Sequence, residues 1–355
     1  MKKILKTLAL SLLFIPFIAG CKAPVFYEIM RDVAPEEATV NGVITSITRY
    51  KSGNEEKLVT FSSDGLIWKD ANGTSHGQWS PFPNSNQLSG KIIKTAADSS
   101  NLYVVTITFH EDVEKGLNLP DVATLWYYNN GSWGKVENTP KLNPGNFNIF
   151  CTNDVDNSKR SAYLRIGDKV YGLSGTNFPT YEKATGNYNS VVSGGNSDYI
   201  FFESTASVKN GNYIYWGEGS KLYYSKDTSN PKENKELALD AGTDISCLAA
   251  TKDALLIGRG DFSNSLISKG GIAKTSLKDG VPGNSLESFS TNATSQLASV
   301  YQIYTLLVAK PDQPELNASI YASMGFKGSG SSTSVSYDNI GLWSYYPARG
   351  NWNRE

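Results

Sequence analysis

Two short segments carry residue types that could bind a metal ion. Residues 110–114 read His-Glu-Asp-Val-Glu; they begin like a helical zinc site, but Glu114 stands where the second histidine is needed, in a strand-to-loop context. Residues 153–158 alternate Asn and Asp as calcium loops do, but Lys159 and Arg165 replace the glycine and the acid that such loops require. We therefore predict neither a metal site nor a cofactor.

Other catalytic patterns are also missing from the sequence. There is no Gly-x-Ser-x-Gly elbow and no phosphate loop, and the Gly- and Ser-rich residues 325–334 read as a flexible connection. His76 lies in a polar loop and is expected to be solvated. A sialidase-like site needs three converging arginines, and no motif assigns the arginines that follow the signal segment (Arg31, Arg49, Arg160, Arg165, Arg259, Arg349 and Arg354). We predict a protein that is not an enzyme.

The N-terminal segment carries a modification site. Lys2, Lys3 and Lys6 precede a short apolar run that is too short to span a bilayer and contains Pro16. The run ends at residues 18–21, Ile-Ala-Gly-Cys, which resemble the lipobox of bacterial lipoproteins. The resemblance implies cleavage between Gly20 and Cys21, acylation of Cys21 with diacylglycerol and palmitate, and anchoring of the chain in membrane lipid.

Several consequences follow for location. No aspartate follows Cys21, which favours the outer membrane, on its periplasmic or its surface face, if the organism has two membranes. Cleavage removes three lysines and no acid from a chain whose formal net charge is −1, so no basic surface for nucleic acid is expected. Cys151 and Cys247 lie in strand-like settings and are predicted to be buried free thiols, although export would permit a bridge.

The remaining sequence predicts an all-β fold. Helical periodicity is nearly absent, and short runs rich in β-branched and aromatic residues alternate with Gly, Asn, Asp and Ser. Clear examples of such predicted strands are residues 57–61, 101–109, 212–216 and 254–258. With 39% hydrophobic and 12% aromatic residues, disorder is excluded.

The tryptophans reveal a repeat. Trp68 and Trp79, Trp126 and Trp133, and Trp343 and Trp352 each flank a Gly-containing turn, which predicts an aromatic strand, a turn and a second strand with Trp. At residues 72–73 and 130–131 the turn is Asn-Gly, which tolerates positive φ. Paired tyrosines on the same strands (Tyr127–Tyr128, Tyr223–Tyr224 and Tyr345–Tyr346) are expected mainly to pack between sheets.

Weaker copies fill the spaces between and give about six groups of up to four strands. We therefore predict a β-propeller of six four-stranded blades, with seven blades or a pair of stacked β-sandwiches as alternatives. The fourth group is ambiguous because both residues 189–202 and 212–224 could form its hairpins. The predicted organisation is a signal peptide at 1–20, a lipidated tether at 21–40 and the propeller at 41–355.

Residues 63–68, Ser-Asp-Gly-Leu-Ile-Trp, look like the Asp-box turn of sialidase-type propellers, shortened by one residue. In that family the box is a structural hairpin, so the resemblance implies the fold more than an activity.

Two functions from different classes remain open. The favoured one is a lipid-anchored, non-catalytic binding or scaffolding protein of the bacterial cell envelope, whose partner is an envelope protein or an extracellular ligand. The alternative is a glycan-active hydrolase of the sialidase-like propeller type.

Overall fold

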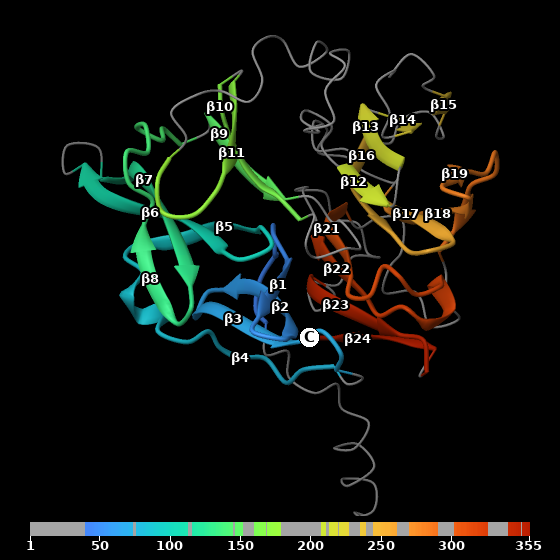
Figure 1. Ribbon diagram of the computed structural model, residues 1–355, viewed down its shortest axis with the longest axis horizontal. Helices are drawn as coiled ribbons and strands as arrows, with labels where there is room; N and C mark the ends of the chain where they lie inside the picture. The colour runs from blue at the N-terminus through green and yellow to red at the C-terminus, as the bar shows by residue number, and fades with distance from the viewer. Residues whose placement is uncertain are drawn as a thin grey trace, which may run out of the picture. The chain divides into compact units, whose positions relative to one another are not determined.

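The structure, a computed structural model, is built from antiparallel β-sheets (Figure 1). Contacts divide the chain into two units, Met1–Glu37 and Ala38–Glu355, and all described residues belong to the second. They are residues 40–73, 76–112, 116–144, 146–151, 160–167, 169–178, 207–210, 213–218, 220–226, 235–238, 244–260, 270–289, 302–325, 340–348 and 350–355. The all-β prediction is confirmed for this part of the chain.

The first three sheets each consist of strands that are consecutive in the chain. The first contains β1 (Thr48–Ser52), β2 (Glu55–Ser62), β3 (Gly65–Asp70) and β4 (Ser80–Pro81). The second contains β5 (Lys91–Ala97), β6 (Leu102–Asp112), β7 (Leu117–Asn129) and β8 (Ser132–Lys135). The third contains β9 (Phe147–Cys151), β10 (Ala162–Ile166) and β11 (Lys169–Leu173). A 3-10 turn, η1 (Ser85–Gln87), lies between the first two sheets in sequence.

The last three sheets follow the same rule. The fourth contains β12 (Ser207–Asn210), β13 (Tyr213–Glu218), β14 (Lys221–Lys226) and β15 (Lys235–Ala238). The fifth contains β16 (Asp244–Ala250), β17 (Ala254–Gly260), β18 (Gly271–Lys278), β19 (Val281–Pro282) and β20 (Glu287–Ser288). The sixth contains β21 (Gln302–Val308), β22 (Ile320–Gly325), β23 (Gly341–Tyr346) and β24 (Asn351–Arg354), with the 3-10 turn η4 (Glu315–Asn317) before β22.

The predicted strands overlap the observed ones, although residues 101–109 begin one residue before β6, and residue 212, before β13, lies outside the described residues. Residues 57–61 lie in β2 and residues 254–258 in β17. The fourth sheet takes its central strands β13 and β14 from within residues 212–226, one of the two hairpins that the sequence allowed. The other, residues 189–202, lies outside the described residues.

All three tryptophan hairpins are present. Trp133 of β8 lies opposite Tyr128 of β7, and Trp352 of β24 lies opposite Tyr345 of β23. In the first hairpin Trp79 comes immediately before β4, whose Ser80 pairs with Trp68. The pattern was readable because each unit is local in sequence, with its aromatic residues a few positions either side of one turn.

The two Asn-Gly turns behave differently. Asn130 and Gly131 have φ values of 48° and 88°, as a two-residue hairpin turn requires. Asn72 and Gly73 tolerate positive φ but do not adopt it. The reason is local, because Asp70 binds both residues there, accepting the Asn72 N–H with its side chain (2.8 Å) and the Gly73 N–H with its carbonyl (3.1 Å).

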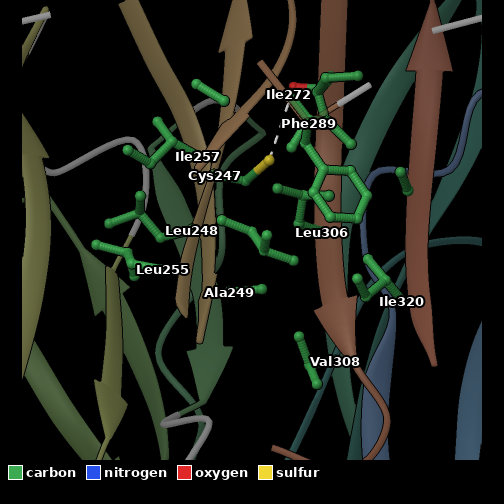
Figure 2. Close-up of a cluster of buried hydrophobic side chains, with 14 of the residues drawn as sticks. Cys247, Leu248, Ala249, Leu255, Ile257, Ile272, Phe289, Leu306, Val308 and Ile320 are labelled. Atoms are coloured by element: carbon green, nitrogen blue, oxygen red, sulfur yellow. Dashed lines mark hydrogen bonds between the residues drawn. The ribbon is translucent and has the colours of Figure 1, made fainter. Parts of the chain in front are cut away.

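The hydrophobic core lies between sheets rather than within one. One cluster joins the first two sheets and contains Tyr50, Val59, Val104 and Tyr128, together with Phe82 from the loop that connects them. Other clusters join the second and third sheets, the fourth, fifth and sixth sheets, and the sixth and first sheets. Figure 2 shows part of the cluster that joins the fourth, fifth and sixth sheets, with side chains of β16 and β21 packed together. Each sheet therefore buries apolar surface against a neighbour in sequence order.

A buried ion pair connects the first sheet to the end of the sixth. Lys69 Nζ of β3 donates to Glu355 Oε2 over 2.9 Å, and the two side chains are 1% and 0% exposed. Glu355 Oε2 also accepts the Trp79 Nε1–H (2.6 Å) and the Gly77 N–H (3.0 Å). The backbone joins the same two regions, because the Val40 N–H donates to the Glu355 carbonyl and the Glu355 N–H to the Leu342 carbonyl.

Aromatic rings enclose the Lys69 ammonium. Its Nζ lies 5.4 Å from the ring centroids of Trp79 and Tyr321 and 5.7 Å from that of Tyr346. Burial lowers the pKa of Lys69, and the charge of Glu355 opposes that shift. The positive charge of the ammonium is therefore balanced by the Glu355 carboxylate and by the faces of these three rings. We call this group, Lys69, Trp79, Tyr321, Tyr346 and Glu355, the closing cluster.

We expect Glu355→Gln to lower the free energy of unfolding by about 3–5 kcal/mol, because the substitution leaves the Lys69 charge buried without its counter-ion. Urea denaturation monitored by tryptophan fluorescence measures the change. The matched control is Glu55→Gln, which breaks the Glu55–Lys57 pair (2.6 Å) where Glu55 is 67% exposed, and which should cost at most about 1 kcal/mol. Equal effects of the two substitutions would contradict a special role for the closing cluster.

Candidate functional site

Several residues singled out from the sequence lie outside the described residues. These are Gly20 and Cys21 of the lipobox and residues 153–158. Of residues 325–334, only Gly325 is described, at the end of β22. His76 is half-buried rather than fully solvated, and the following Gly77 binds the closing cluster.

His110 lies on strand β6, as the strand-to-loop interpretation required, and β6 continues to Asp112. Its Nδ1 is 2.6 Å from Asp121 Oδ1 on β7, and both side chains are well exposed, at 56% and 41%. Within the described residues no three His, Cys, Asp or Glu side chains are grouped so that they could hold a metal ion.

The described arginines bind groups of the protein itself. The Arg160 guanidinium donates to the Arg49 carbonyl (2.9 Å) and to Glu56 Oε1 (2.6 Å), which ties the start of β10 to the first sheet. Arg354 donates to the Ile340 carbonyl. Arg49 and Arg160 are therefore brought together, but the contacts that join them are structural.

One member of each tyrosine pair is buried, as expected. Tyr128, Tyr224 and Tyr346 are 6%, 9% and 1% exposed, and Tyr128 packs edge-on against Phe82 at 4.8 Å. Tyr127, Tyr223 and Tyr345 are partly exposed. The paired tyrosines thus serve mainly as packing groups between sheets.

The most exposed apolar surface lies on the hairpin formed by β6 and β7 (Figure 1). Of the four large apolar side chains that are exposed among the described residues, Phe109 (48%), Leu117 (53%) and Val122 (43%) belong to this hairpin, and Val43 (37%) does not. Scattered single apolar residues are ordinary on a surface, but three of the four lie on this one hairpin, with Leu117 on the opposite face from Phe109, and such a concentration marks the hairpin as a candidate interaction site.

This hairpin extends beyond its neighbours in the sheet. Strand β5 pairs with β6 only as far as Ile107, and β8 pairs with β7 only from Trp126 onward. Beyond these limits, towards the turn of the hairpin, β6 and β7 continue to pair with each other, from Phe109 opposite Pro120 to Asp112 opposite Leu117. We call residues 108–112 and 117–122 the ribbon, and it is our candidate functional site.

Sequence reasoning missed the ribbon because it ended the strand near Phe109 and interpreted the following residues as a failed metal motif. A signal was present, since Leu117, Leu119 and Val122 are apolar residues among polar ones. The sequence could not show how far β5 and β8 accompany the hairpin, and that difference in length creates the exposed surface.

A half-buried lysine lies on β5 of the same sheet. Burial lowers the pKa of Lys94, with no opposing charge to offset the effect. Among the described residues no carboxylate or hydrogen-bond acceptor binds its ammonium, in contrast to Lys69. Lysines whose pKa is lowered by burial occur at functional sites, and they also occur where a fold buries the charge without any functional role.

Both described cysteines are free thiols, as predicted. Cys247 is buried in the core between β16 and β21, where its Sγ lies 3.9 Å from the Ile303 carbonyl (Figure 2), and burial raises its pKa to about 12. Cys151 is only partly buried, which corrects the expectation that both would be buried.

No helix in the described part of the chain is long and apolar enough to cross a membrane.

No family model and no curated protein matches the sequence. Among solved structures the chain is similar to one in a crystal structure of a nidogen/laminin complex, with 9% identity and a TM-score of 0.42 over 88% of this chain and 91% of that one. It is also similar to puromycin hydrolase, with 10% identity and a TM-score of 0.38 over 75% of this chain and 39% of that one. At these values neither similarity bears on what the chain does.

We expect Lys94→Met to raise the free energy of unfolding by about 1 kcal/mol at neutral pH, because methionine keeps much of the apolar stem and removes a charge that burial disfavours. The wild-type chain should gain stability as the pH rises from the lowered pKa toward that of an ordinary lysine, since only the unfolded state then keeps the proton. In Lys94→Met no group titrates at this position, so its free energy of unfolding should not show this rise with pH.

Urea denaturation across a pH series measures both effects. The matched control is Lys91→Met, an exposed position on the same strand, which should change stability by less than about 0.5 kcal/mol. A loss of stability in Lys94→Met would instead mean that the ammonium has a stabilising partner.

Proposed function

We propose that this chain is a lipid-anchored, non-catalytic binding or scaffolding protein of the bacterial cell envelope. The lipobox at residues 18–21 supports the anchor, which would hold the body at the outer membrane if the organism has two membranes. The ribbon supports the binding role, and it is the observation that carries the proposal.

We further propose that the six sheets are blades of a six-bladed β-propeller. Three features support this: each sheet is made of consecutive strands, apolar clusters join the first three sheets to one another and the last three to one another, and the closing cluster joins the last sheet to the first. Residues 179–206, which connect the third sheet to the fourth, lie outside the described residues.

A packed platform favours binding because it holds an exposed hairpin in place at low entropic cost. Residues near the base of the ribbon are buried, among them Val105, Ile107 and Leu125, whereas Phe109 and Leu117 further along it are exposed. The ribbon thus projects apolar side chains from a well-packed sheet. Against the glycan-hydrolase alternative, the guanidinium of Arg160 is occupied by structural contacts.

We expect Cys21→Ser to move the protein from the detergent phase to the aqueous phase in a Triton X-114 partition, because the acyl chains supply the affinity for lipid. Mass spectrometry of the wild-type protein should find an acylated Cys21 as its N-terminus. Cys151→Ser, which removes a thiol elsewhere, should stay in the detergent phase. Retention of Cys21→Ser there would contradict the lipid anchor.

We expect cross-linked membranes to yield a stoichiometric partner of the tagged full-length protein. The double substitution Phe109→Ser/Val122→Ser should lower its recovery about tenfold or more, because aromatic anchors dominate interface energies. Val43→Ser removes an exposed apolar side chain outside the ribbon and should leave recovery unchanged. If no partner is recovered, or if all three proteins recover it equally, the proposed binding role is wrong.

A further inference from the structure

We propose that the outer edge of β6, from Phe109 to Glu111, binds an extended segment of a partner protein as an added β-strand, and that this segment carries an apolar and a basic residue two positions apart. The inference rests on the proposed binding function and specifies the partner's chemistry at the ribbon. Strand addition of this kind draws affinity from main-chain hydrogen bonds and selectivity from alternate side chains.

The edge is open on the β6 side. The last residue of β6 that pairs with β5 is Ile107, opposite Lys91, and Thr108 lies at a break in the register of the β6–β7 pairing. From Phe109 to Asp112 the described strand partner of β6 is β7 alone. Among the described strands none pairs with the other side of β6 from Phe109 to Glu111, and an edge of this kind is a template for another strand.

The β7 side is protected by two features. Pro120 lacks an N–H group, and proline on an edge strand discourages further pairing. Ala123 is already engaged, because its N–H donates to the Leu142 carbonyl over 3.1 Å. Thr108 through Asp112 contain neither proline nor lysine, the residues that commonly guard an edge. The two edges of one hairpin thus differ, and only β6 can accept a strand.

The charge of the ribbon selects the occupant. Glu111 is exposed and has no ion-pair partner among the described residues, whereas Asp121 pairs with His110 and accepts a hydrogen bond from the Thr108 hydroxyl over 3.4 Å. Asp112 adds a third carboxylate. A basic segment complements this acidic surface, whereas a second copy of the same edge would bring the same acids together at a cost.

The alternation of β6 then sets the pattern of the partner. Phe109 and Glu111 are two residues apart and share one face of the ribbon, with Pro120 opposite Phe109 and Asn118 opposite Glu111. An added strand would place an apolar side chain beside Phe109 and a basic one beside Glu111, two residues further along. The expected recognition element is therefore an apolar residue and a basic residue in alternate positions.

The test measures binding of short fluorescent peptides to the full-length protein in detergent micelles by anisotropy. The probe is an extended peptide with the repeat Val-Thr-Lys-Thr, in which valine and lysine stand two residues apart and therefore share one face. One comparison peptide has glutamate in place of lysine, and another is methylated on backbone nitrogens along one edge. We expect both comparison peptides to bind at least about tenfold more weakly than the probe, because one loses charge complementarity and the other loses main-chain donors.

Variants of the ribbon locate the binding. Glu111→Lys should weaken the valine–lysine peptide about fivefold or more by reversing a charge, and Phe109→Ser should weaken it by a similar factor. The matched control is Asp64→Lys, which reverses an exposed charge in the turn between β2 and β3 and should have no effect. Both ribbon variants change exposed side chains, and circular dichroism checks that each stays folded.

Three outcomes would overturn the inference: equal binding of all peptides, binding that neither ribbon variant alters, or self-association of the protein that Glu111→Lys changes in sedimentation. The third would identify a second copy as the occupant. Failure here leaves the proposed function standing if membranes still yield a partner that depends on Phe109 and Val122. If the peptide binds as expected but cross-linked membranes yield no partner that depends on Phe109 and Val122, the proposed function is wrong instead.

Discussion

The ion pair between Lys69 and Glu355 joins β3 of the first sheet to the residue that follows β24 of the sixth. Pairs of this kind rarely add much net stability, since both charges must leave water, but they are costly to break and allow few alternative arrangements. Here the carboxylate accepts the ammonium, an indole N–H and a backbone N–H, and three aromatic rings surround the cation. The contact therefore specifies which strands meet where the first and sixth sheets come together.

Apolar packing between sheets depends on that meeting. The cluster shared by the sixth and first sheets contains Ile44, Leu58, Leu307 and Tyr321, and the Ile44 N–H donates to the Ser323 hydroxyl over 2.8 Å. A small antiparallel sheet with both faces apolar must cover each face with another sheet. If the first and last sheets separated, both would expose such a face, so an interaction between residues 286 positions apart in sequence protects the cores at both ends of the series.

The sequence predicted what is local and missed what is not. Hairpins marked by Trp126 and Trp133, or by Trp343 and Trp352, were found because the aromatic residues and their turn lie within a few residues of each other. The closing cluster was not foreseen, because nothing near Lys69 or Glu355 in sequence distinguishes them from surface charges. The ribbon was missed for a related reason: its exposure depends on where β5 stops, which is a property of the partner strand and not of residues 108–122.

The point at which β5 begins to pair with β6 has its own physical cause. Gly90 immediately precedes β5, has a φ of +89° and lies so close to β6 that a Cβ atom would be 2.7 Å from the Ile107 carbonyl oxygen. Only glycine accepts both the left-handed conformation and that approach without strain. The chain therefore approaches β6 closely at Ile107, where the pairing of β5 with β6 begins. Gly90 therefore helps to set where the pairing of β5 with β6 begins, and with it where the open edge of β6 begins. A single residue of the sheet thus shapes the surface proposed to receive a partner.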